Sequence, residues 1–120
     1  MNILIVDDNG NDRALAYRAM RTAFPDAAIH LLNTAQAFDR FGEFASLDLV
    51  ITDWDLKLGT GRRIITAVKG RMPGCPVIIF TGSVDDCRSL AAEEGADDCV
   101  LKSGDMNLLI AAARRCLQGV

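Results

Sequence analysis

The residues best suited to chemistry are acids, a hydroxyl and an amine that each follow a short apolar run. Asp7 and Asp8 follow one such run, and Asp53, Thr81 and Lys102 each follow another. Carboxylates a few ångströms apart repel one another, and a divalent cation relieves that repulsion. An all-oxygen ligand set that retains water molecules suits Mg²⁺. The acids therefore indicate a Mg²⁺ site, provided that the fold brings them together.

Such a site suits phosphoryl transfer. A carboxylate held beside Mg²⁺ can attack phosphorus and form an aspartyl phosphate. The ammonium of Lys102 and the hydroxyl of Thr81 would stabilise the charge that develops on the phosphoryl oxygens. Asp53 and Asp55 lie in the same predicted loop, so these residues alone leave open which of the two is the nucleophile.

The elements that must position these residues alternate between strands and helices. Strands are predicted at residues 2–6, 28–32, 47–52, 76–80 and 98–101, and helices at 11–24, after Thr34, after Gly61, at 85–94 and at 105–117. Strict alternation implies right-handed crossovers and a parallel sheet with helices on both faces. Of two plausible strand orders, the commoner for five units is 2-1-3-4-5. The predicted fold class is therefore α/β, a flavodoxin-like (βα)5 doubly wound five-stranded sheet whose sites lie at the carboxyl ends of the strands.

Length and composition narrow the function classes. The 120 residues fit one domain, and a chain that is 50% hydrophobic and 24% charged has an ordinary soluble globular composition. The net charge of -3 and the scattered basic residues disfavour nucleic-acid binding. No apolar run approaches the ~20 residues that span a bilayer, and the N-terminus lacks the features of a signal peptide. We therefore expect a cytoplasmic protein that does not bind membranes.

The four cysteines do not show a metal-binding spacing. Cys75, Cys87, Cys99 and Cys116 include no CxxC pair, and the chain has one histidine. A disulfide framework is typical of smaller, secreted, loop-rich chains. We expect the cysteines to be reduced and mostly packed as small hydrophobic residues.

Four short motifs resemble the receiver domain of the two-component response-regulator family, in its stand-alone, chemotaxis-regulator-like form. They are VDD ending at Asp8, ITDWDL around Asp53, FTGS around Thr81 and GADDCVLK ending at Lys102. Each is weak alone, but together and in this order they span nearly the whole chain. The resemblance implies a single receiver domain over residues 1–120, without an output domain, in a two-component system or phosphorelay.

The resemblance also implies roles for the acids. Asp53 would accept a phosphoryl group from a histidine kinase or a histidine phosphotransfer protein, and phosphorylation would switch protein–protein interactions. Asp8 and Asp53 would ligate Mg²⁺ directly, together with the backbone carbonyl of Asp55, and Asp7 would act through water. The chain would catalyse only its own phosphorylation and dephosphorylation, so it would not be an enzyme in the usual sense.

Two further pairs of residues take their roles from the same resemblance. Thr81 and Lys102 would contact the phosphoryl oxygens. Asp55 and Ser83, each two residues beyond a motif residue, would tune the lifetime of the phosphate.

The chain departs from the family at two positions. Cys99 stands where the family usually has an aromatic residue that swings inward on phosphorylation. Ser103 stands where a proline, often in a cis peptide bond, usually follows the lysine. A cis bond before a residue other than proline costs about 3–4 kcal/mol, so we expect a trans bond here. We also expect the change on phosphorylation to pass through the loop after the fourth strand, by movement of Thr81.

The sequence leaves open the downstream target of the signal and two alternative functions of the chain. The downstream protein target is unknown, and the apolar face of the last helix, which carries Met106, Leu109 and Ile110, is compatible with homodimers. One alternative is a degenerate receiver that acts as an unphosphorylated binding module. The other is a phosphatase of the haloacid-dehalogenase type, for which residues 53–55 supply a D-x-D motif. In that family, however, this motif lies on the first strand and the core is larger.

Overall fold

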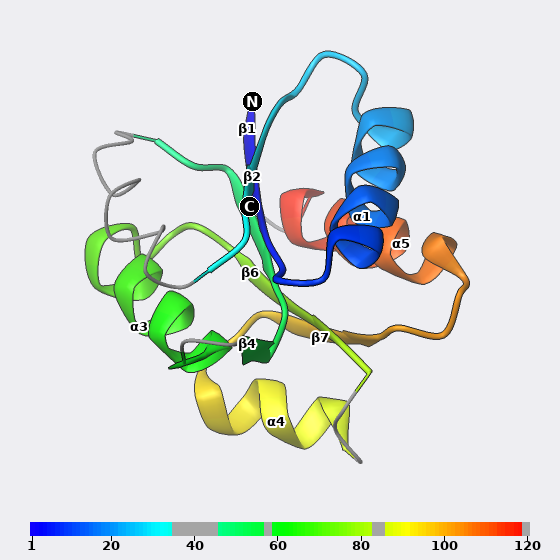
Figure 1. The fold of residues 1–120 in the computed structure, drawn as a ribbon. Helices are drawn as coiled ribbons and strands as arrows, with labels where there is room; N and C mark the ends of the chain where they lie inside the picture. The colour runs from blue at the N-terminus through cyan, green and yellow to red at the C-terminus, as the bar shows by residue number, and fades with distance from the viewer. Residues whose placement is uncertain (35–45, 57–58, 83–85, 119–120) are drawn as a thin grey trace.

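The computed structural model describes residues 1–34, 46–56, 59–82 and 86–118. Its elements are β1 (Asn2–Val6), α1 (Gly10–Ala23), β2 (Ala28–Leu32), β3 (Leu49–Thr52), β4 (Asp55–Leu56), β5 (Gly59–Thr60), α3 (Gly61–Arg71), β6 (Val77–Thr81), α4 (Cys87–Glu94), β7 (Asp98–Leu101) and α5 (Met106–Gln118). Five parallel strands form one sheet in the order β2-β1-β3-β6-β7 (Figure 1). Because β6 and β7 are its fourth and fifth strands, the predicted order 2-1-3-4-5 and the flavodoxin-like fold are confirmed.

Helices cover both faces of the sheet (Figure 1). Alternate residues of β1 point to opposite faces, as the period of two in a strand requires. Ile3 and Ile5 pack in a core with α1 and α5, whereas Leu4 and Val6 pack in a second core with α3. Burial on both faces explains why the central strands are continuous apolar runs.

Local capping signals set the ends of the helices. The side chain of Asn9 accepts a hydrogen bond from the backbone N–H of Asp12 at the start of α1, and Asp86 does the same for Ser89 in α4. This cap explains why α4 begins at Cys87, two residues later than predicted. Gly95 ends α4 in the left-handed conformation (φ +76°), which glycine adopts at little cost.

One segment differs from the sequence prediction, and two further predictions fall on residues outside those that the structure describes. The predicted loop after β3 contains a short antiparallel hairpin of β4 and β5. The helix predicted after Thr34 and the predicted role of Ser83 fall outside the described residues. Of the helices in the described part of the chain, none is long and apolar enough to cross a membrane.

The prediction that all four cysteines are reduced is wrong for one pair. Cys87 and Cys99 form a disulfide, and Cys75 and Cys116 are free. The crossover from α4 to β7 brings the Cα atoms of the pair to 5.3 Å, within the range that a disulfide spans. The sequence separation of 12 residues does not reveal this approach, because it depends on how α4 packs beside β7.

Candidate functional site

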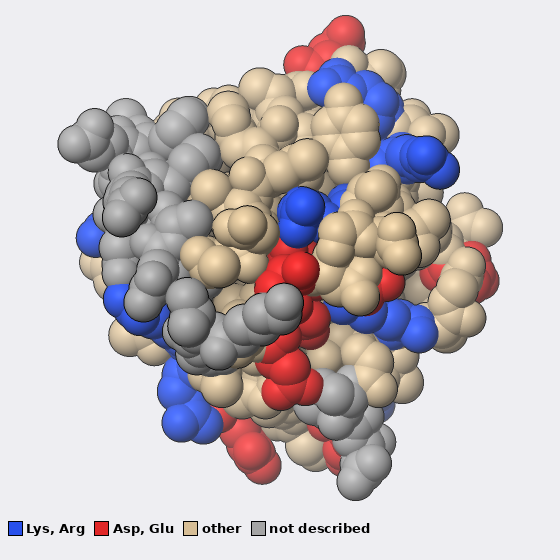
Figure 2. All heavy atoms as spheres, in the orientation of Figure 1, with Lys and Arg blue, Asp and Glu red and all other residues tan. Residues whose placement is uncertain are grey.

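Three carboxylates meet where β1 and β3 end. The backbone N–H of Asp53 donates to the carbonyl of Val6 at 2.9 Å, which places the residues after the two strands side by side. One carboxylate oxygen from each of Asp7, Asp8 and Asp53 lies within 4.8 Å of the other two. Asp7 and Asp53 are buried, whereas Asp8 is partly exposed. Figure 2 shows acidic side chains gathered near the middle of this face of the molecule. The cluster is an all-oxygen donor set that a solvated cation can reach from the side of Asp8.

Lys102 supplies the positive charge at the same edge. Its backbone N–H donates to the carbonyl of Thr81 at 3.0 Å, because β7 pairs in parallel with β6. Its Nζ lies 2.8 Å from Asp7 Oδ2, 3.1 Å from Asp53 Oδ2 and 3.0 Å from Asp12 Oδ2. The ammonium therefore bridges the end of β1, the end of β3 and the first turn of α1.

Burial and charge act on the pKa values of this cluster. Burial raises the pKa of Asp7, since desolvation penalises its charged form more than the hydrogen bonds from Lys102 and Asn9 favour it. Burial also disfavours the ammonium of Lys102. Its hydrogen bonds to Asp7 and Asp12 and the nearby charge of Asp53 outweigh that effect, so the pKa of Lys102 is raised. Lys102 is therefore a fixed positive charge at neutral pH.

Backbone contacts hold Asp7 in place. Its Oδ1 accepts a hydrogen bond from the backbone N–H of Asn9 at 2.9 Å. Its carbonyl accepts one from Arg13 Nη1 at 2.8 Å. Both partners belong to the start of α1, so the helix that caps on Asn9 also fixes the first acid of the cluster.

Gly61 allows the loop after Asp53 to pack closely against α3. The backbone N–H of Gly61 donates to the carbonyl of Trp54 at 2.7 Å. A Cβ atom at Gly61 would lie 2.6 Å from the carbonyl oxygen of Asp53 and 3.2 Å from Cα of Trp54. Real Cβ atoms essentially never come within 3.0 Å of another atom, so the contact with the carbonyl oxygen of Asp53 would force a shift. The position of Asp53 thus depends on a glycine eight residues later in the chain.

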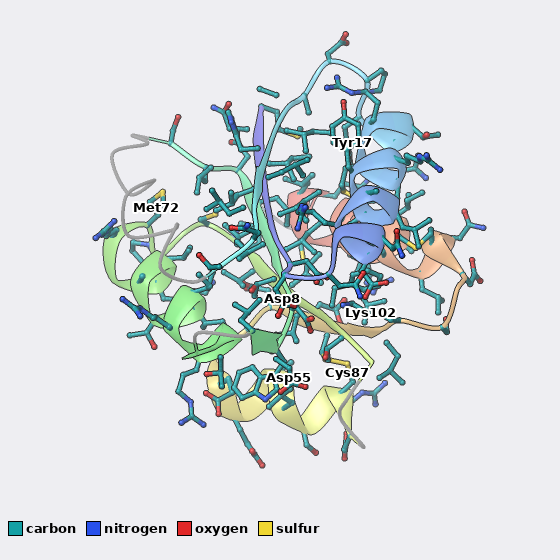
Figure 3. All side chains as sticks on the ribbon, in the orientation of Figure 1. Asp8, Tyr17, Asp55, Met72, Cys87 and Lys102 are labelled. Carbon is teal, nitrogen blue, oxygen red and sulfur yellow. A yellow bond between two sulfur atoms is a disulfide. The ribbon has the colours of Figure 1, made fainter. Side chains whose placement is uncertain are left out.

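The structure brings together most of the predicted site residues. Asp7, Asp8, Asp53 and Lys102 converge, and Thr81 is buried at the end of β6 next to the backbone of Lys102. The carboxylate of Asp55 is not in the cluster: Asp55 is exposed in the hairpin. In Figure 3 the labelled Asp8 and Lys102 lie close to the end of β1, whereas Asp55 lies toward α4. Its predicted contribution is a backbone carbonyl, and that stays a prediction.

Sequence reasoning missed Asp12. This residue lies in the first turn of α1 and forms an ion pair with Lys102. The available signal was its position at the start of a helix that begins at the same sheet edge as Asp7 and Asp8.

The expectation of a trans Lys102–Ser103 bond is confirmed, since the described residues contain no cis peptide bond.

Comparison with known proteins gives consistent matches. The sequence model of the response regulator receiver domain matches residues 3–114. The two-component response regulator ORR6 of Oryza sativa subsp. japonica is 28% identical over 106 residues, which are 85% of this chain and 62% of that protein. The chain thus spans less than two thirds of the length of this curated relative.

Solved structures share the fold over almost the whole chain. A response regulator receiver domain protein from Clostridium thermocellum is 25% identical, with a TM-score of 0.84, over 98% of this chain and 94% of that one. The BeF3-activated receiver domain of DrrB, a protein of Thermotoga maritima, is 27% identical, with a TM-score of 0.85, over 98% of this chain and 97% of that one.

Proposed function

Because the chain belongs to the response regulator receiver domain family, we propose that Asp53 is its phosphoacceptor and that Mg²⁺ is required for the transfer. One observation carries this proposal. A buried carboxylate, Asp53, lies within one cluster with two further acids, and Lys102 Nζ lies 3.1 Å from Asp53 Oδ2. A nucleophilic carboxylate, a set of oxygen ligands and a fixed positive charge are the components that phosphoryl transfer to aspartate needs.

The donor set fits Mg²⁺. Asp7, Asp8 and Asp53 supply carboxylate oxygens without nitrogen or sulfur, and the partly exposed Asp8 leaves room for retained water. We assign Asp8 and Asp53 as direct ligands together with the backbone carbonyl of Asp55, and Asp7 as a ligand through water. Bound Mg²⁺ would neutralise repulsion between the carboxylates and the incoming phosphoryl oxygens.

The chain's own residues carry the transfer. An oxygen of Asp53 attacks the phosphorus of a phosphohistidine on a histidine kinase or phosphotransfer protein. The new P–O bond forms as the P–N bond breaks, and the imidazole leaves with the electron pair. Lys102 and the hydroxyl of Thr81 bind the phosphoryl oxygens as they gain charge. Asp55 and Ser83 tune the subsequent hydrolysis. The chain therefore turns over no substrate apart from its own phosphoryl group.

The signal then passes to a protein target in the cytoplasm. Thr81 ends β6, so its movement toward the phosphoryl group would act on the segment that leads to α4. Cys99 is bonded to Cys87, and this bond leaves it no in-and-out movement of the kind an aromatic residue makes. The apolar face of α5 that was expected to support homodimers points inward instead, because Leu109 is fully buried and Met106 and Ile110 pack against the core that α5 shares with α1.

Intact mass spectrometry tests the proposal. The wild-type chain incubated with Mg²⁺ and acetyl phosphate should gain one phosphoryl group, and chelation of Mg²⁺ should prevent the gain. Asp53→Asn should gain none. Asp26→Asn is the matched control, because Asp26 is an exposed carboxylate just before β2, at the edge where the strands begin, and it should gain one. Uptake by Asp53→Asn at the wild-type rate would overturn the assignment. Uptake by none of the variants, either from acetyl phosphate or from a phosphorylated phosphotransfer protein, would instead favour an unphosphorylated binding module.

A further inference from the structure

A covalent bond joins α4 to the edge of the sheet, and neither of its cysteines belongs to the acidic cluster. Cys87 is the first residue of α4, and Cys99 is the second residue of β7. Figure 3 labels Cys87 at the start of α4. Both cysteines are partly exposed and line a surface groove of about 600 Å³ between α4, β7 and α5. A thiol from solvent or from another protein can therefore reach the bond.

We propose that Cys87 and Cys99 form a redox site, at which a partner protein dithiol reduces the bond between α4 and β7 and thereby frees α4. This site lies outside the phosphoacceptor cluster and uses different chemistry. The partner belongs to the class of thiol–disulfide oxidoreductases, which present two cysteines to an accessible disulfide.

The packing of α4 makes this bond important for its position. Of the eight residues of α4, all of them described, Ala91 is the one that is buried. By contrast, α3 buries four residues and α1 buries three. The ion pair between Arg62 and Glu94 involves an exposed arginine, and such surface pairs contribute little. The disulfide is thus the strongest single link between the start of α4 and the sheet.

Charged residues of both signs line the groove. Arg88 follows Cys87 directly, Asp98 precedes Cys99 directly, and Arg115 of α5 pairs with Asp98. Because these charges offset one another, it is access from solvent that favours attack on this bond. In contrast, the thiol of Cys75 is buried, and burial raises its pKa to about 11, so Cys75 does not take part.

The reaction balances with a protein dithiol as the reductant. One thiolate of the partner attacks one sulfur of the Cys87–Cys99 bond, forms a mixed disulfide and releases the other sulfur as a thiolate. The second thiol of the partner then displaces the remaining cysteine and closes the partner's own disulfide. Two electrons and two protons pass to this chain, which ends with two thiols. Oxidation by the disulfide form of the same partner is the reverse.

The redox site adjoins the segments that leave the acidic cluster. Cys99 precedes Lys102 by three residues along β7, and α4 follows the strand that ends at Thr81. We expect the oxidised chain to restrain the movement of α4 that phosphorylation causes, and the reduced chain to permit it. This consequence, unlike the redox site itself, rests on the proposed function.

Counting thiols tests the site. A chain with Cys75→Ser and Cys116→Ser, equilibrated with oxidised glutathione, denatured and treated with N-ethylmaleimide, should take up no maleimide. After equilibration with dithiothreitol or a reduced thiol–disulfide oxidoreductase it should take up two. Maleimide uptake of two after oxidation, or glutathione adducts in place of an internal bond, would overturn the site.

Amide hydrogen exchange tests the effect on α4. Residues 87–94 should exchange at least tenfold faster in the reduced chain than in the oxidised chain, whereas α1 should exchange equally in both. Equal exchange in α4 would overturn the release of this helix. The two proposals fail separately. Absence of phosphoryl uptake in both redox states would leave the thiol counts and the exchange difference intact, and four thiols in every state of the wild type would leave phosphoryl uptake intact.

Discussion

Lys102 donates to three carboxylates at once, from Asp7, Asp12 and Asp53. Its pKa is raised in the folded chain despite the cost of burial, because these acids favour the ammonium. The stabilising contribution of the ammonium is therefore complete below the ordinary lysine pKa and is lost only as the pH rises through the raised value. At neutral pH the charge is available both to hold the acids and to meet a phosphoryl group.

Replacing Lys102 distinguishes its role in holding the carboxylates together from its role in stabilising the phosphoryl group. Lys102→Met should leave Mg²⁺ binding intact or stronger, because the carboxylates lose a competing cation. It should slow phosphoryl uptake from acetyl phosphate by about 10²–10³-fold, the typical effect of removing one group that stabilises transition-state charge. Lys69→Met is the control, since Lys69 pairs with Asp97 at the edge of the sheet where β6 and β7 begin, whereas the cluster lies where the strands end. Equal rates for Lys102→Met and wild type, measured by intact mass, would contradict the role of Lys102.

The metal assignment makes a prediction for Asp8. Mg²⁺ should change the fluorescence of Trp54, which directly follows Asp53 and is the one tryptophan of the chain. Asp8→Asn should weaken the apparent affinity for Mg²⁺ at least about tenfold, because one charged ligand is lost. Asp55→Asn should bind as wild type does, since its backbone carbonyl is kept. If Asp55→Asn weakened binding and Asp8→Asn did not, the ligand assignment would be wrong.

At the residue level the sequence predicted the cluster but not all of its members. Asp7, Asp8, Asp53 and Lys102 each follow a strand of the sheet, and parallel strands end at a common edge, so their convergence was predictable. Asp12 was not predicted because it reaches the site from a helix, and the direction of a helical side chain depends on how the helix docks. The position of a residue directly after a strand does not reveal which side chains of the neighbouring helix reach the same edge of the sheet.

The contact between α3 and the loop after β3 makes the sharpest prediction at the level of elements. Gly61→Ala would place a Cβ atom 2.6 Å from the carbonyl oxygen of Asp53, so the loop or the helix must shift. We expect the free energy of unfolding to fall by about 1–3 kcal/mol, the usual cost of overpacking. Phosphoryl uptake should also slow, because Asp53 moves with the loop.

Gly70→Ala in the same helix is the matched control. A Cβ atom at Gly70 meets nothing within 4 Å, and alanine favours a helix over glycine by about 0.5–1 kcal/mol. Chemical denaturation should therefore show a small gain in stability for Gly70→Ala and a loss for Gly61→Ala. Equal effects of the two substitutions would show that the close approach at Gly61 does not matter.

The elements themselves were largely predictable, and their exceptions have physical causes. Continuous apolar runs and alternation with helices indicated the sheet and its order, and Gly95 marked the end of α4. The hairpin of β4 and β5 was missed because each strand has two residues, too short for a period of two to be seen. Its formation depends on the docking of the loop against α3.

At the scale of the whole molecule, the Cys87–Cys99 bond was the feature that the sequence did not predict. The same bond makes a prediction about stability. A disulfide that closes a loop of this size reduces the entropy of the unfolded chain, so reduction should lower the free energy of unfolding by about 3 kcal/mol. Urea denaturation of the chain with Cys75→Ser and Cys116→Ser, with and without dithiothreitol, measures this difference without thiol exchange. Coincident curves would contradict the bond.

The most direct test of the account asks which atom accepts the phosphoryl group. Borohydride reduces an acyl phosphate to an alcohol and so converts a phosphorylated aspartate to homoserine. The wild-type chain, phosphorylated with Mg²⁺ and acetyl phosphate, reduced and digested, should carry homoserine at position 53 in the peptide mass spectrum. Homoserine at position 7, 8 or 55, or at none of them despite a gain of one phosphoryl group in the intact mass, would contradict the assignment of Asp53.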